Sequence, residues 1–115
     1  KDLAQMKRYL PQPDYDAFEE RGRFELYGYA LREALRQGTK GAVRDIRMYT
    51  QPLDIRLQDI RTPLHLFHGA KDENVPIALV QDMLSQLPTA HLIAYPHDAH
   101  LSTLCNHFDE IASVL

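Results

Sequence analysis

The chain has 115 residues, of which 44% are hydrophobic and 25% charged, so it is long enough for one domain with a single core. Its net charge of −3, with basic residues scattered along the sequence, argues against a nucleic-acid-binding surface. The sequence contains no long uncharged apolar run, which argues against a membrane span. The single cysteine, Cys105, allows no internal disulfide and no cysteine-rich zinc module. With one cysteine and no signal-like leader, we expect a cytoplasmic protein.

The first half of the chain carries helical periodicity. Residues 1–10 already have helical spacing, and the prolines that follow predict the end of this first helix. A second helix is predicted to begin between residues 14 and 16, where Asp16 and Glu19 have the spacing of a capping box. Its apolar positions continue to Gly38, which suits a helix C-terminus because glycine adopts the left-handed conformation without a Cβ clash.

The pattern changes after Pro52, which is predicted to stop a short third helix. Residues 64–68 form a short apolar run between Pro and Gly, typical of a strand, and residues 91–95 form a second one. Helical spacing predicts one helix over residues 77–87 and another over residues 101–115. Because a helix connects the two strands, we predict an α/β fold in which the strands are parallel.

Two residues at the ends of the predicted strands are candidates for chemistry. Asp72 lies in the loop after the first strand, and His100 lies in the loop after the second. The carboxyl ends of parallel strands meet at one edge of the sheet, where ligands bind in open α/β folds. A carboxylate that accepts a hydrogen bond from one imidazole nitrogen fixes the tautomer and frees the other nitrogen as a base. We therefore predict that a carboxylate oxygen of Asp72 lies within ~3 Å of a His100 ring nitrogen.

From about residue 53 to residue 115 the sequence resembles the C-terminal end of α/β-hydrolases. The resemblance rests on the segment Pro-Leu-His-Leu-Phe-His-Gly-x-x-Asp-x-x-Val-Pro at residues 63–76, and on His100, 28 positions after Asp72. In that family an acid follows the seventh strand and the catalytic histidine follows the eighth. The resemblance therefore implies that Asp72 is the acid and His100 the histidine of a triad. Residues 1–52 are similar to the helical cap that precedes these strands in many members.

The nucleophile of such a triad is missing from the sequence. In this fold the order is nucleophile, acid, histidine, with the nucleophile in a Gly-x-Ser-x-Gly turn, and none of the five glycines frames a serine. Ala99 stands where the family usually has glycine before the histidine. The resemblance therefore implies the C-terminal fragment of a serine hydrolase for an ester, amide or related small acyl substrate, without a metal or organic cofactor. We expect the isolated chain to be inactive and to need the missing N-terminal half as its partner.

Several alternatives remain open from the residues alone. Asp72 could be a turn residue that caps the next helix, Glu73 could be the acid, and Cys105 could be a nucleophile paired with His100. The same fold also serves non-catalytic ligand-binding or interaction modules, and an exposed sheet edge could lead to self-association. Among the histidines, we interpret His65 and His68 as strand residues with hydrogen-bond partners, and His91, His97 and His107 as surface residues. The histidines that invite a zinc site are His65, His68, His97 and His100.

Overall fold

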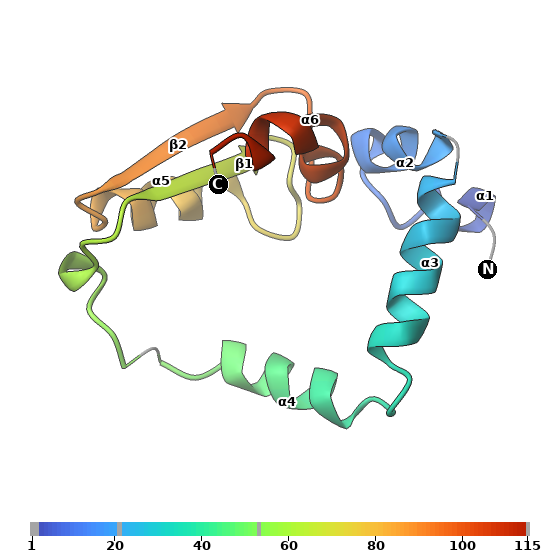
Figure 1. Ribbon diagram of the computed structural model, residues 1–115, viewed down its shortest axis with the longest axis horizontal. Helices are drawn as coiled ribbons and strands as arrows, with labels where there is room; N and C mark the ends of the chain where they lie inside the picture. Colours follow the sequence, from blue (N-terminus) through green and yellow to red (C-terminus); the bar gives the residue numbers. More distant parts are fainter. Residues whose placement is uncertain (1–2, 21, 53, 115) are drawn as a thin grey trace.

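The computed structural model of the protein, shown in Figure 1, describes residues 3–20, 22–52 and 54–114. These described residues form a mixed α/β arrangement with six α-helices and a two-stranded parallel sheet. Within the same ranges, no helix is long and apolar enough to cross a membrane. In chain order the elements are α1 (Leu3–Met6), α2 (Gln12–Glu19), α3 (Arg23–Ala34), α4 (Lys40–Tyr49), η1 (Leu57–Asp59), β1 (Leu64–Gly69), α5 (Ile77–Ser85), β2 (Ala90–Tyr95) and α6 (Ser102–Ala112).

The second half of the chain has the predicted order of strand, helix, strand and helix. β1 and β2 pair in parallel, and the register runs from Leu64 opposite Ala90 to Gly69 opposite Tyr95. The connection passes through α5, which packs on β2, while α6 packs against β1. Both strands therefore end at the same edge of the sheet, and the two loops that follow them start side by side (Figure 1).

The single helix predicted from residues 14–16 to Gly38 is wrong, because the structure has two helices there. Glu20, after the end of α2, is extended, and Gly22 has a φ of 74°, which glycine adopts readily and other residues rarely do. The capping box is also wrong, because α2 already begins at Gln12 and Asp16 lies inside it. Proline is tolerated in the first turn of a helix, where its missing N–H has no partner to lose, so Pro13 fits within the start of α2.

Of the first and last helices of the helical half, one is shorter than predicted and the other forms as predicted. The helix predicted over residues 1–10 is a single turn, α1, whereas α4 forms between Thr39 and Pro52 as expected. Every residue of α4 is exposed, and Figure 1 shows this helix apart from the sheet. The predicted boundary between the two segments, at residue 53, and the ends of the chain at residues 1, 2 and 115 lie outside the described residues.

The buried part of the helical half lies between α2 and α3. Phe18 is 5% exposed, and its ring lies 5.9 Å from that of Phe24 and 5.1 Å from that of Tyr27. α2 also packs on α6, and Arg23 at the start of α3 donates a hydrogen bond of 2.9 Å to the Cys105 carbonyl of α6. The helical half is therefore held against the end of the sheet through α6, near the candidate site.

Candidate active site

The loops after β1 and β2 are joined by backbone hydrogen bonds. The Ala70 N–H donates to the Tyr95 carbonyl, and the Lys71 N–H donates to the Asp98 carbonyl, each at 2.9 Å. Gly69 brings the loops still closer, because a Cβ added there would lie 2.4 Å from the Ala99 carbonyl oxygen. The absence of a side chain at this position therefore allows the two loops, and the residues that they carry, to approach one another.

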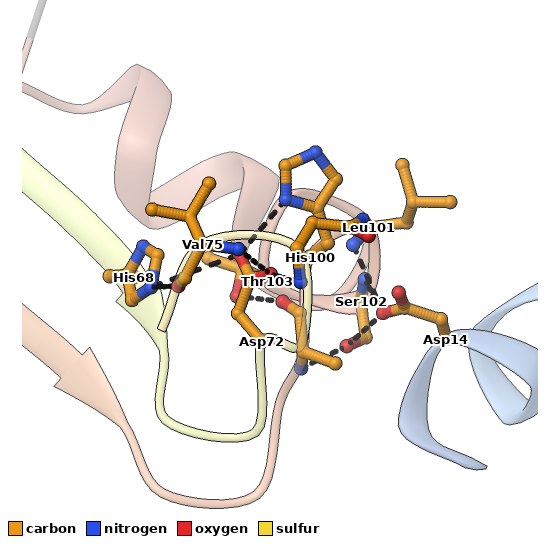
Figure 2. Close-up of polar contacts among 10 residues, drawn as sticks. Asp14, His68, Asp72, Val75, His100, Leu101, Ser102 and Thr103 are labelled. Atoms are coloured by element: carbon orange, nitrogen blue, oxygen red, sulfur yellow. Dashed lines mark hydrogen bonds and ion pairs between the residues drawn. The ribbon is translucent and has the colours of Figure 1, made fainter. Parts of the chain in front are cut away.

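Asp72 and His100 are in direct contact, as predicted. Oδ2 of Asp72 lies 2.9 Å from Nδ1 of His100 (Figure 2). Oδ1 of the same carboxylate accepts hydrogen bonds from the backbone N–H groups of Asn74, at 2.8 Å, and Val75, at 2.9 Å. Asp72 is therefore both a turn residue and the partner of His100, because each role uses a different oxygen. It does not cap α5, whose N-cap Pro76 has no side-chain cap hydrogen bond.

The environment of Asp72 favours the ionised carboxylate. Its side chain is only 3% exposed, and burial by itself raises the pKa of a carboxyl group. The hydrogen bond from the Val75 N–H, followed by those from His100 and the Asn74 N–H, outweighs burial. The net result is that the pKa of Asp72 lies below its ordinary value of 3.8, so the carboxylate is charged at neutral pH.

The charged carboxylate determines which nitrogen of His100 carries the proton. An ionised carboxylate has no proton to give, so it accepts a hydrogen bond from Nδ1–H of the neutral ring. Nε2 then carries the lone pair, and it has no hydrogen-bond partner among the described residues. The His100 side chain is 45% exposed, so this nitrogen is placed to take a proton from a group that approaches the ring.

An open pocket of about 400 Å³ lies beside the pair. Asp72 and His100 line it together with the apolar side chains of Phe67, Leu104 and Ile111. Leu104 is 55% exposed, so the apolar face predicted for α6 is uncovered on this side. The pocket thus combines a histidine and a carboxylate with an apolar wall, a composition typical of small-molecule sites.

Of the two histidines in β1, His68 has a hydrogen-bond partner, whereas His65 is exposed and has none among the described residues, contrary to the prediction. Nε2 of His68 lies 2.9 Å from the Val75 carbonyl and 3.8 Å from Oδ2 of Asp72, which confirms the prediction of a strand histidine with a hydrogen bond. Glu73 is exposed, and the histidine contact belongs to its neighbour Asp72. Across the described ranges, no group of three or more histidine, cysteine or acidic side chains is arranged to hold a metal ion.

A second pair of histidine and carboxylate was missed by the sequence reasoning. His107, predicted to be a surface residue, is only 28% exposed, and its Nε2 lies 2.9 Å from Oδ2 of Asp98. The ring stacks on Tyr95 at 3.6 Å between centroids. Burial, followed by a hydrogen bond to Glu110, raises the pKa of Tyr95 to about 12. The side chains of this pair are 28% and 10% exposed, so its histidine is less accessible than the half-exposed His100.

Cys105 does not have the environment of an activated thiol. Burial raises the pKa of its thiol, although the charge of Arg23 opposes that rise. A raised pKa keeps sulfur protonated at neutral pH, and only the thiolate is a good nucleophile. The geometry thus favours the pair on the two loops over the cysteine as the centre of any chemistry.

No protein-family model, curated protein or solved structure matches the chain.

Proposed function

We propose that Asp72 and His100 are the acid and the base of a catalytic triad, and that this chain is the C-terminal part of a serine hydrolase of the α/β-hydrolase type. The proposal rests chiefly on one observation, the 2.9 Å contact between a buried carboxylate and Nδ1 of a half-exposed histidine. The position of this pair, in the loops at the carboxyl ends of two parallel strands, supports it. The substrate is an ester, an amide or a related small acyl compound.

The nucleophile of the proposed triad comes from outside this chain. Each of the three serines already donates its hydroxyl to another group: Ser85 to the Asp82 carbonyl, Ser113 to the Glu110 carbonyl, and Ser102 to the Asp14 carboxylate. Ser85, at the end of α5, and Ser113, directly after α6, are both exposed. A serine carried by an N-terminal half of the protein would therefore be the attacking group, and that half would be the partner of this chain.

In the proposed reaction His100 moves one proton in each direction. Nε2 accepts the serine hydroxyl proton as the serine oxygen bonds to the acyl carbon, and the ring becomes an imidazolium. The imidazolium then gives this proton to the leaving group as its bond to the acyl carbon breaks. Water, activated by Nε2 in the same way, releases the acyl group and restores the serine. Asp72 remains ionised throughout and stabilises the imidazolium across the 2.9 Å contact.

A serine-directed fluorophosphonate tests this function. The full-length gene product should be labelled, whereas the 115-residue chain alone should not. Replacing His100 by Ala in the full-length protein should slow labelling by roughly 10⁴-fold or more. His97, an exposed histidine of the same loop, provides the matched control, and H97A should label at the rate of the wild type. Equal labelling of H100A and wild type, or labelling of the chain alone, would contradict the proposal.

A non-catalytic interaction module is the second candidate, and the uncovered apolar face of α6 favours it. Leu104 and Phe108 are 55% and 61% exposed, and exposed apolar patches often mark binding surfaces. The two candidates differ in the probe experiment, because an interaction module built on this fold would leave the full-length protein unlabelled. In that case the contact between Asp72 and His100 would serve only to hold the two loops together.

A further inference from the structure

The N-terminus of α6, directly after His100, is capped by a residue from the other half of the chain. Leu101 occupies the N-cap position, and its side chain cannot accept a hydrogen bond. The free backbone N–H groups of Leu101 and Ser102 instead donate to Oδ1 of Asp14, at 3.0 and 2.7 Å. The Ser102 hydroxyl donates to the same oxygen at 2.8 Å, as Figure 2 shows.

Asp14 is almost completely buried, so its carboxylate depends on protein groups for hydrogen bonds. It lies in α2, 87 residues before Leu101, and is 1% exposed. A buried carboxylate is costly unless hydrogen bonds replace its hydration. The two backbone N–H groups and the hydroxyl of the α6 N-terminus supply that replacement, and the positive end of the helix dipole adds to it. The carboxylate and the helix terminus therefore hold each other in place.

The same contacts fix the backbone on both sides of His100. The Ser102 hydroxyl oxygen that donates to Asp14 also accepts a hydrogen bond of 2.7 Å from the Ala99 N–H. The Thr103 hydroxyl donates to the Ala99 carbonyl, again at 2.7 Å. Ala99 is fully buried and Ser102 likewise, each with 0% exposure. The half-exposed His100 thus sits between two residues that the Asp14 network immobilises.

We propose that Asp14 is a positioning residue for His100, which holds the start of α6 so that the imidazole stays within hydrogen-bond distance of Asp72. The inference rests on the proposed function for its catalytic meaning, but its geometry can be tested without any activity. This proposal gives the helical half of the chain a specific role, which is to hold the loop of His100 in place. α2 packs on α6 and also supplies the carboxylate that orients the loop of His100.

The test follows the carboxyl carbon of Asp72 by NMR during acid titration of the folded chain. In D14A the loop loses its anchor, the contact with His100 weakens, and the pKa of Asp72 should rise. The direction is diagnostic, because the loss of a nearby negative charge by itself would lower the pKa of Asp72. D14N keeps an acceptor oxygen for the three donors but removes the charge, so in D14N the pKa of Asp72 should not rise above that of the wild type.

Two further variants make the outcome unambiguous. D16A removes an exposed carboxylate from the same helix and should leave the Asp72 titration unchanged. If D14A does not fold, S102A removes the hydroxyl that links Asp14 to Ala99, and it should raise the pKa of Asp72 in the same direction. An unchanged or lower pKa of Asp72 in folded D14A or in S102A would overturn the role of Asp14. Failure of phosphonate labelling would instead overturn the hydrolase proposal and leave this result standing.

Discussion

Replacement of Gly69 by alanine should separate the two loops that carry the candidate site. The added Cβ would lie 2.4 Å from the Ala99 carbonyl oxygen and 2.5 Å from that of Asp98. Ordinary carbon–oxygen contacts begin near about 3.3 Å, so the shortfall is about 1 Å. Both obstacles are backbone atoms, which cannot rotate away as the end of a flexible side chain would. The loops must therefore move apart by about 1 Å to accommodate the methyl group.

This movement has two measurable consequences. Overpacking of this kind costs about 1–3 kcal/mol of unfolding free energy, which urea denaturation followed by circular dichroism would record. A displacement of about 1 Å would also take the Asp72–His100 contact from hydrogen-bond distance to beyond the usual limit of about 3.2 Å. Gly69 does not have a positive φ, so the loss would come from the contact and not from backbone strain.

Gly28 provides the matched control for this substitution. It lies inside α3, and a Cβ there would meet only the end of the Arg32 side chain at an ordinary 3.5 Å. Because alanine is a better helix former than glycine, G28A should gain up to about 1 kcal/mol. If G69A were as stable as the wild type, with the Asp72–His100 contact intact, the close approach of the two loops would be refuted.

Two further predictions concern the acid at the site and the packing of the helical half. The pKa of Asp72 is lower in the folded protein than its ordinary value of 3.8, which it has when the chain is unfolded. The contribution of Asp72 to stability is therefore fully present above pH 3.8 and is lost as the pH falls through the lower pKa of the folded protein. In D72N, the unfolding free energy should be lower by about 1–3 kcal/mol at pH 7, and its decline between pH 5 and pH 2 should be shallower than in the wild type; urea titrations at a series of pH values measure both. F18A should cost about 3–5 kcal/mol, since the ring is 5% exposed and packed on two others. F108A, at a 61% exposed position, should change stability by no more than about 0.5 kcal/mol. Equal effects of F18A and F108A would show that α2 and α3 do not enclose a core.

The parts of the fold that the sequence predicts well depend on local patterns. The two short apolar runs end at Gly69 and just before Pro96, and a helix between them requires a crossover, so parallel strands follow. Once the strands are parallel, their following loops meet at one edge. The contact of Asp72 with His100 could therefore be predicted although 28 residues separate them.

The parts that could not be predicted depend on contacts between distant segments. The break between α2 and α3 falls within residues 19–23, which have no apolar side chain, so the apolar spacing did not mark the end of one helix and the start of the next. Asp14 looks like an ordinary residue at the start of a helix, and only the packing of α2 on α6 reveals its buried carboxylate. The pairing of His107 with Asp98 likewise depends on how α6 packs against the loop after β2. The sequence did contain one signal, because His107 and Glu110 are three residues apart and such pairs are neighbours on a helix. In the structure both side chains contact Tyr95.

The tautomer of His100 tests the central claim most directly. At a pH where the ring is neutral, its two ¹⁵N chemical shifts report which nitrogen carries the proton. The wild-type chain should show Nδ1–H, which donates its hydrogen bond to the carboxylate of Asp72. In D72N the amide oxygen should remain on the Asn74 and Val75 N–H groups, so the amide NH₂ would face Nδ1 and the proton would move to Nε2. A wild-type His100 protonated at Nε2, or the same tautomer in both proteins, would contradict the assignment of Asp72 and His100 as acid and base.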